Sequence, residues 1–175
     1  VEEDDIAESQ IKWVVNLFTP IKDKCIGLLY GNHEDSIRKF NHSNVIKSIC
    51  ERLGVDNLGF SCFLRFQFKR GQHISRITGA FTHGSSSAIT EGAKTMALMR
   101  FMKSFQADIY GYAHIHDYIP KSLSRLYVNN NGKIRQTVSI GATTGSWFRT
   151  YTQGILASYG EVKVYPPTEL CAAVF

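Results

Sequence analysis

The chain of 175 residues lacks any long hydrophobic run. No stretch approaches the roughly 18 apolar residues that a membrane-spanning helix needs. No basic segment followed by an apolar one opens the sequence, as it would in a leader peptide. The four cysteines are scattered and form no Cys-x-x-Cys pair, which argues against a zinc ribbon or a redox motif. We therefore expect a cytoplasmic protein with buried, reduced thiols and no contact with a membrane.

A strong charge of one sign is also absent. Lysine and arginine exceed the acidic residues by five, and no single run concentrates them. Ordinary surface charge explains so modest an excess, although an anionic substrate such as a phosphate ester or nucleic acid would explain it too. Arg65, Lys69, Arg70 and Arg76 fall on one expected hairpin. They either guide a polyanion or form a solvated strand face, and the second interpretation is favoured.

Apolar residues recur with both the helical and the strand period. The helical period predicts helices over residues 7–18, 44–53 and 90–106. Strands are predicted over residues 25–30, 60–68, 74–81, 108–110 and 134–140, the first of them buried on both faces. The sequence Asn129-Asn130-Asn131-Gly132 predicts a type I′ hairpin turn. These elements predict one α/β domain over residues 1–175, with two sheets in its core and helices outside them.

Three histidine-bearing segments each follow a predicted strand. They are Gly31-Asn32-His33-Glu34, Thr82-His83-Gly84 and Gly111-Tyr112-Ala113-His114-Ile115-His116-Asp117. Neutral imidazole is the commonest protein ligand of transition metals, and a rigid sheet holds ligands at the ends of its strands at fixed spacing. The pattern therefore predicts a metal site on the rim of a sheet.

The first segment combines an amide, an imidazole and a carboxylate. Asn32 offers a neutral oxygen to a metal, and His33 can protonate a leaving alkoxide. Glu34 can orient the ring of His33 through its other nitrogen. A turn that carries a surface histidine fits the same residues equally well.

The other two segments supply further imidazoles. His83 is either a second ligand on the same rim or a loop histidine before a helix, with the serines at 85–87 as candidate capping residues. Taken alone, it favours the loop. His114 and His116 point to the same side if the chain between them is extended, so both imidazoles would face one site. A paired surface strand is the alternative, and the metal interpretation is favoured.

A glycine-rich segment, Gly141–Trp147, follows the last predicted strand and is a candidate border of the site. Its small residues would let a substrate approach, and Trp147 would stack on a base. The alternative is a tryptophan packed in the core after a glycine turn, and this alternative is favoured.

Taken together and in this order, the three segments resemble motifs of the calcineurin-like metallophosphoesterases. That family has five motifs, which read Asp-x-His, Gly-Asp-x-x-Asp, Gly-Asn-His-Asp/Glu, an isolated His, and Gly-His-x-His. Gly31–Glu34 matches the third motif and His83 the fourth. Ala113–His116 matches the fifth, with alanine in place of the usual glycine. The resemblance extends from about residue 24 to residue 145.

The resemblance implies a two-sheet β-sandwich flanked by helices, and metal-dependent hydrolysis of phosphate esters, with phosphodiesters favoured. Asn32, His83 and His114 would bind one divalent ion, and His116 would bind a second. His33 would act as the acid or contact the phosphate, oriented by Glu34. Manganese is the expected metal, with zinc, iron or magnesium as alternatives, and a metal-bound hydroxide would attack the phosphorus. The partner would be a phosphate-ester substrate, with nucleic acid as one candidate.

The first two motifs of the family are absent from these 175 residues. In the family they supply two aspartates and a histidine, including the aspartate that bridges the two metals. We expect the chain to be an N-terminally truncated fragment, whose acidic start at Val1–Asp5 lies just after the lost Gly-Asp motif. Such a fragment would be weakly active or inactive by itself.

Two other functions compete with this interpretation. A catalytically inactive module of the same fold would bind a partner or scaffold an assembly. The missing carboxylates favour such a module, whereas the retained His33 argues against it. A mononuclear metal hydrolase that uses Asn32, His83, His114 and His116 ranks lower, because a neutral ligand set leaves the charge of the cation unbalanced.

Overall fold

The computed structural model describes residues 3–175, so Val1 and Glu2 of the acidic start lie outside it. The chain divides into two compact units, Val1–Cys62 and Phe63–Phe175, and each is described by itself. A five-stranded mixed sheet, a two-stranded sheet and several helices confirm the expected mixed α/β class. Within the described residues, no helix has the length and apolar character that crossing a membrane requires.

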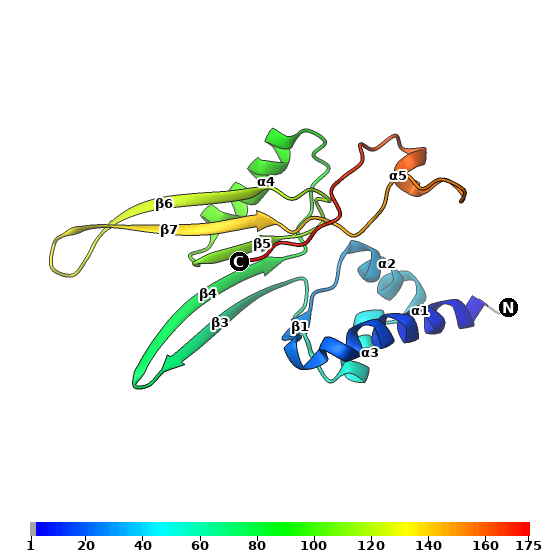
Figure 1. Ribbon diagram of the computed structural model, residues 1–175, viewed down its shortest axis with the longest axis horizontal. Coiled ribbons are helices and arrows are strands. Elements are labelled where there is room, and N and C mark those ends of the chain that lie inside the picture. Colours follow the sequence, from blue (N-terminus) through cyan, green and yellow to red (C-terminus); the bar gives the residue numbers. More distant parts are fainter. Residues whose placement is uncertain (1–2) are drawn as a thin grey trace. The chain divides into compact units, whose positions relative to one another are not determined.

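Unit 1 is mainly helical. Its elements are α1 (Glu3–Phe18), the 3-10 helix η1 (Thr19–Lys24), β1 (Gly27–Leu28), α2 (Asn32–Asn41), α3 (Val45–Leu53) and β2 (Asp56–Asn57), with β1 parallel to β2. Helices α1 and α3 lie side by side (Figure 1), and Ile11, Ile49 and Leu53 are buried between them. As the sequence predicts, the side chain of Asn44 caps α3 by accepting the N–H of Lys47, and Gly54 ends it with a φ of +70°.

One prediction for unit 1 is wrong, and one helix of this unit has no prediction. Residues 25–30 form a strand of only two residues, and Ile26 in this run is 54% exposed, because within this unit β1 has the single neighbour β2. Residues 32–41, which carry no predicted helix, form α2. This helix buries none of its residues, so the sequence has no apolar period there from which to predict it.

Unit 2 contains one sheet, whose first strand begins two residues before the unit. Its elements are β3 (Ser61–Arg70), β4 (His73–Thr82), α4 (Glu91–Ser104), β5 (Ile109–Tyr112), β6 (Pro120–Val128), β7 (Ile134–Thr143) and α5 (Tyr159–Val162). The strand order is β3-β4-β5-β7-β6. Strands β4, β5 and β7 are parallel, whereas β3–β4 and β6–β7 are antiparallel hairpins (Figure 1).

Helix α4 covers one face of this sheet, which we call the helix face (Figure 1). Leu98 and Met102 of α4 are fully buried against Ala80 of β4 and Tyr110 of β5. Because side chains alternate along a strand, the residues between these point to the opposite face, which we call the second face. That face is rich in apolar side chains, including Phe66, Phe81, Val138 and Ile140.

The predicted hairpin at Asn129–Gly132 is confirmed, but its turn is not type I′. A type I′ turn needs two consecutive residues with positive φ, whereas of these four residues only Gly132 has one, at +72°. The N–H of Gly132 donates to the carbonyl of Asn129, and the N–H of Asn129 donates to the carbonyl of Lys133. The side-chain oxygen of Asn129 accepts the N–H groups of Asn131 and Lys133, which stabilises this wider loop.

All four cysteines are free thiols, but of the four only Cys50 is buried, whereas the sequence predicts buried thiols. Burial raises the pKa of the Cys50 and Cys62 thiols. Both therefore stay protonated near neutral pH, which suits packing residues better than nucleophiles.

Candidate functional site

Three parallel strands of unit 2 end at one edge of the sheet, which we call the histidine edge. Thr82 of β4 pairs with Tyr112 of β5, which pairs in turn with Thr143 of β7, so the carboxyl ends of the strands are level. The loops that carry His83, and His114 with His116, start at this edge. Ligands of α/β proteins bind at the carboxyl ends of parallel strands, so this edge is the candidate site.

His83 and His114 are in direct contact at the histidine edge. Nδ1 of His114 lies 3.3 Å from Nε2 of His83, and the two rings are inclined by 72°. Two nitrogens bound to one tetrahedral zinc ion at about 2.0–2.1 Å are roughly 3.3–3.4 Å apart. The separation therefore fits two ligands of one ion, and it equally suits a hydrogen bond from one neutral ring to the other.

His114 is held in a strained backbone turn. The N–H of Ile115 donates to the carbonyl of Ala113 over 2.7 Å, which closes a three-residue γ-turn centred on His114. The φ of His114 is +65°, a region that residues other than glycine seldom adopt. Strain of this kind costs about 1–3 kcal/mol and is concentrated at functional sites. The turn is thus a second observation, besides the contact with His83, that singles out this residue.

The loop that carries His83 is fixed by Tyr112. The hydroxyl of Tyr112 donates to the carbonyl of Ser85 over 2.9 Å and accepts its N–H over 3.0 Å. Between His83 and Ser85, Gly84 has a φ of +73°, and a Cβ there would lie 2.3 Å from the Tyr112 ring. A side chain at position 84 would therefore displace the loop, so glycine is required for His83 to reach His114.

The expected capping role of the serines at 85–87 is wrong. These residues precede α4 without capping it. Thr90 is the N-cap residue, and its hydroxyl accepts the N–H of Ala93. His83 is thus a loop histidine before a helix and, at the same time, a partner of His114.

His116 does not follow the predicted pattern. The γ-turn at His114 replaces the extended conformation that would have pointed both rings to one side. The ring of His116 instead lies 6.1 Å from that of Phe148. Among the described side chains, those of residues 6–175, no three His, Cys, Asp or Glu are grouped as ligands of a metal would be. The described geometry therefore shows a contact between two imidazoles and not a set of three ligands.

The loop after His116 is tied to the rest of unit 2 at Asp117. Its carboxylate forms an ion pair with Lys94 of α4. Its carbonyl accepts the hydroxyl of Thr143, and that hydroxyl oxygen accepts the N–H of Ile119 over 2.8 Å. These contacts hold the segment that carries His116 at both α4 and β7.

Lys94→Met is expected to lower the free energy of unfolding by about 1–3 kcal/mol, because it leaves the Asp117 carboxylate without its cation. The range lies below that for a fully buried pair, since the Asp117 side chain is 31% exposed. Urea denaturation measures the change. Lys103→Met, an exposed residue of α4 that forms no ion pair in the described structure, is the matched control and should stay within about 0.5 kcal/mol of wild type. Equal effects of the two substitutions would show that the ion pair contributes nothing.

In unit 1, the predicted residues lie on the first turn of α2. Gly31 is the N-cap residue, and Asn32 and His33 begin the helix with exposed side chains. The Glu34 carboxylate accepts the N–H of Gly31 over 2.8 Å. Its described hydrogen bond therefore goes to the backbone of the cap, and not to His33 as the sequence analysis expects. Asp35, one residue further, pairs with Lys39 and Arg38, which lower its pKa.

Trp147 is 74% exposed, so the favoured interpretation of a core tryptophan is wrong. The preceding turn explains why. Gly145 has a φ of +74°, and Ser146 forms a backbone bridge to Leu170. The turn thus packs against the segment at 170–171, which directs the next side chain outward.

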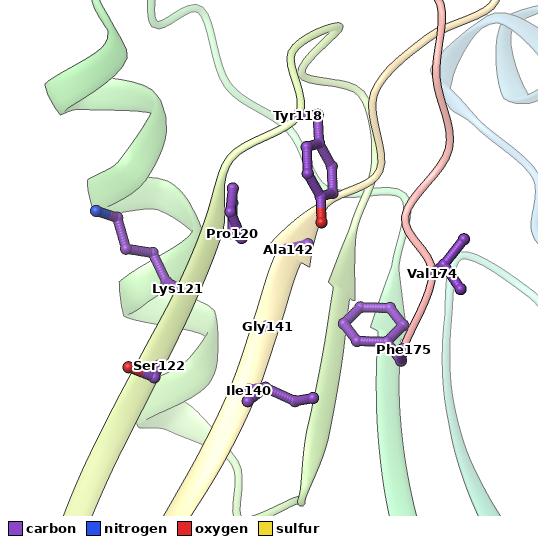
Figure 2. Close-up of a pocket in the computed structure, with 9 residues that line it drawn as sticks. All are labelled: Tyr118, Pro120, Lys121, Ser122, Ile140, Gly141, Ala142, Val174 and Phe175. Carbon is purple, nitrogen blue, oxygen red and sulfur yellow. The ribbon is translucent and has the colours of Figure 1, made fainter.

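A groove of about 410 Å³ lies elsewhere in unit 2 (Figure 2). It is lined by Tyr118, Pro120, Lys121, Ser122, Ile140, Gly141, Ala142, Val174 and Phe175. Figure 2 shows the Lys121 side chain extending away from Phe175, so the groove is mainly apolar. Gly141 and Ala142 of the candidate border segment line it, but none of the predicted metal-binding or catalytic residues does. The candidate site is therefore the exposed histidine edge and not this groove.

Sequence reasoning missed two residues that hold the histidine-bearing loops, Tyr112 for the loop of His83 and Lys94 for the loop after His116. Tyr112 was within its reach, because it lies two residues before His114 in the same segment. Lys94 was not, because it lies on a helix 23 residues before Asp117 and only the fold brings them together. Comparisons of the chain with protein-family models, with curated proteins and with solved structures found no match.

Proposed function

We propose that this chain is a metal-dependent phosphoesterase domain that acts on phosphodiesters. The observation that carries the proposal is the 3.3 Å contact between His83 and His114 at the carboxyl ends of parallel strands. His114 is held in a strained backbone turn and the loop of His83 is fixed by Tyr112, and a binding site needs such rigid support. The order of the Gly31–Glu34, His83 and Ala113–His116 motifs, which resembles that of calcineurin-like metallophosphoesterases, supports the same conclusion.

The proposed roles follow from the chemistry of each side chain. His83 and His114 would hold a divalent ion, manganese first among the candidates, through their facing ring nitrogens. The roles of Asn32 and His116 as further ligands rest on the resemblance. His33 would donate a proton to the departing alkoxide. A pair of bound cations would supply charge neutralisation at the phosphoryl group and an activated water.

We also propose that the sheet of unit 2 is one layer of the two-sheet sandwich that the resemblance implies. The apolar character of its second face supports this, because a sheet face that contacts solvent normally carries polar side chains. Val138, on that face, is 57% exposed, and Ile140 is 44% exposed. A second sheet packed there would bury both side chains.

A catalytically inactive binding module is the second candidate. It is favoured because the described side chains include no group of three His, Cys, Asp or Glu that could hold a metal ion. Two neutral imidazoles alone leave the charge of a divalent ion uncompensated, so they would bind it weakly.

Replacing His33 with alanine separates these candidates. We expect manganese-loaded wild type to hydrolyse bis(p-nitrophenyl) phosphate slowly, and His33→Ala to lower this weak kcat by at least about 100-fold because the leaving group loses its acid. Metal content, measured by elemental analysis, should be the same in both proteins. His73→Ala, which removes an exposed histidine of β4, is the matched control and should leave kcat unchanged. Bound metal without turnover in wild type would instead support the binding module.

A further inference from the structure

Basic and acidic residues are distributed unequally between the two units. Residues 63–175 carry thirteen Lys and Arg against five Asp and Glu, whereas residues 1–62 carry seven against ten. The net charge of +5 for the whole chain therefore combines +8 on unit 2 with −3 on unit 1. An excess of this size on one compact unit indicates an anionic partner.

The excess is concentrated on the two long hairpins of unit 2. Residues 61–82 and 120–143 together hold eight Lys and Arg, and no Asp or Glu. Among the thirteen basic residues of this fully described unit, Lys94 on α4 is the one that forms an ion pair. The hairpin cations therefore have no ion-pair partner among the described side chains.

Six of the eight hairpin cations share one face of the sheet, including Lys121 and Arg125 of β6, which pair with Gly141 and Thr137 of β7. The other four are Arg65 and Lys69 of β3, Arg76 of β4 and Arg135 of β7, and we call these four the basic face. All four side chains are exposed. An array of like charges on one surface raises the local potential more than the same charges scattered around the molecule.

Strand alternation fixes this common direction. Arg76 has the same parity on β4 as Ala80, which is buried beneath α4. Arg135 has the same parity on β7 as Gly141, where a Cβ would meet the sulfur of Met102 of α4.

On β3, Phe66 has the opposite parity to Arg65 and Lys69, and its ring lies near Gly79 on the second face. The basic face is therefore on the helix side.

The basic face lies away from the histidine edge. Both hairpins extend past the start of β5, on the side opposite to the ends of the parallel strands (Figure 1). Arg76 precedes His83 by seven residues along β4, which is roughly 23 Å at the rise of an extended strand. A ligand of the basic face would thus be long, or would bind at a site separate from the histidines.

An exposed aromatic ring lies beside these cations. Tyr127 of β6 pairs directly with Arg135 of β7 and is 50% exposed. Unpaired bases stack on such rings in complexes with single strands. Three of the four cations are arginines, whose planar guanidinium binds phosphate through two N–H groups. These features together favour nucleic acid over an anionic membrane.

We propose that the basic face of unit 2 binds nucleic acid through its backbone phosphates, with Tyr127 placed to stack on an unpaired base. This inference does not rest on the proposed function, because binding at this surface requires neither metal nor turnover. An experiment that contradicts nucleic-acid binding therefore does not contradict the proposed phosphoesterase activity, and the reverse also holds.

Fluorescence anisotropy of the full chain with a labelled 20-nucleotide single strand, in EDTA, tests the proposal. Losing four phosphate contacts should make the negative slope of log K against log salt less steep by about 3. The variant that combines Arg65→Gln, Lys69→Gln, Arg76→Gln and Arg135→Gln is therefore expected to bind at least about tenfold more weakly at 0.1 M salt. Tyr127→Ala should weaken binding of the single strand more than that of a duplex, because only unpaired bases stack on the ring.

The matched control removes four exposed lysines elsewhere, by Lys22→Gln, Lys24→Gln, Lys47→Gln and Lys163→Gln. It changes the net charge equally and should keep most of the affinity. Circular dichroism of both variants verifies that each is folded. Equal losses in the two variants would overturn the proposal, because net charge alone would then explain binding. The absence of oligonucleotide binding, or binding only to vesicles that contain phosphatidylserine, would overturn it as well.

Discussion

Replacing Gly84 with alanine is expected to lower the free energy of unfolding by about 2–4 kcal/mol, as the sum of backbone strain and steric overlap. The first contribution comes from the backbone. The φ of Gly84 is +73°, and an L-residue in this region costs about 1–2 kcal/mol relative to glycine.

The second contribution comes from Tyr112. A Cβ at position 84 would lie 2.3 Å from Cε1 and 2.4 Å from Cζ of this ring, well inside van der Waals contact. The ring has little freedom to move, because Tyr112 is only 7% exposed and its hydroxyl holds both backbone groups of Ser85. Relief of the overlap must therefore shift the loop, and with it His83, away from His114.

Gly71→Ala is the control that isolates the backbone contribution. Gly71 also has a positive φ, at +59°, but nothing lies within 4 Å of the position that its Cβ would take. We expect this substitution to cost only about 1–2 kcal/mol. Urea denaturation of both variants gives the comparison. If Gly84→Ala proves no more costly than Gly71→Ala, the ring of Tyr112 does not constrain the loop.

Replacing His114 with alanine is expected to weaken the binding of zinc or manganese by at least about 100-fold, since even residues that only orient a ligand change affinity by 10–100-fold. His83→Ala should have an effect of similar size, because the two nitrogens that face each other across 3.3 Å would be ligands of the same ion. The double variant should bind metal only slightly more weakly than either single variant, since the effects of residues that act as a unit are not additive.

Isothermal titration calorimetry of the metal-free protein measures these affinities. His73→Ala again serves as the control, because His73 lies on β4 at the end remote from the histidine edge. Its affinity for metal should equal that of wild type. Should His114→Ala bind metal as tightly as wild type, the contact between the two rings is a hydrogen bond of the fold, and the proposed phosphoesterase loses its main support.

Periodicity located those elements that bury one face, within a few residues. The helix predicted over residues 44–53 is α3, Val45–Leu53, and the helix predicted over 90–106 is α4, Glu91–Ser104. Both bury apolar side chains at helical spacing, so their sequences carry the signal. Helix α2 buries none and was missed, and the run at 25–30 looked like a fully buried strand although it pairs over only two residues.

The candidate site was predicted in its residues but not in its geometry. The spacing of His114 and His116 suggested that both rings face one side, yet the γ-turn at His114 gives the rings different neighbours. That turn depends on a positive φ at a residue that is not glycine, which no local sequence rule predicts. Trp147 was assigned to the core for a similar reason, because the sequence does not show where the turn at Gly145 directs it.

The sequence by itself determined the mixed α/β class, most of the helices and hairpins, and which histidines follow the ends of strands. These properties depend on local periods and on turn residues, which are encoded within a few positions of each other. Only the tertiary structure decided that His83 meets His114, that Lys94 meets Asp117, and that six hairpin cations share one face. Each of these depends on strand order and register, which arise when distant segments pack together and are not encoded in any one of them.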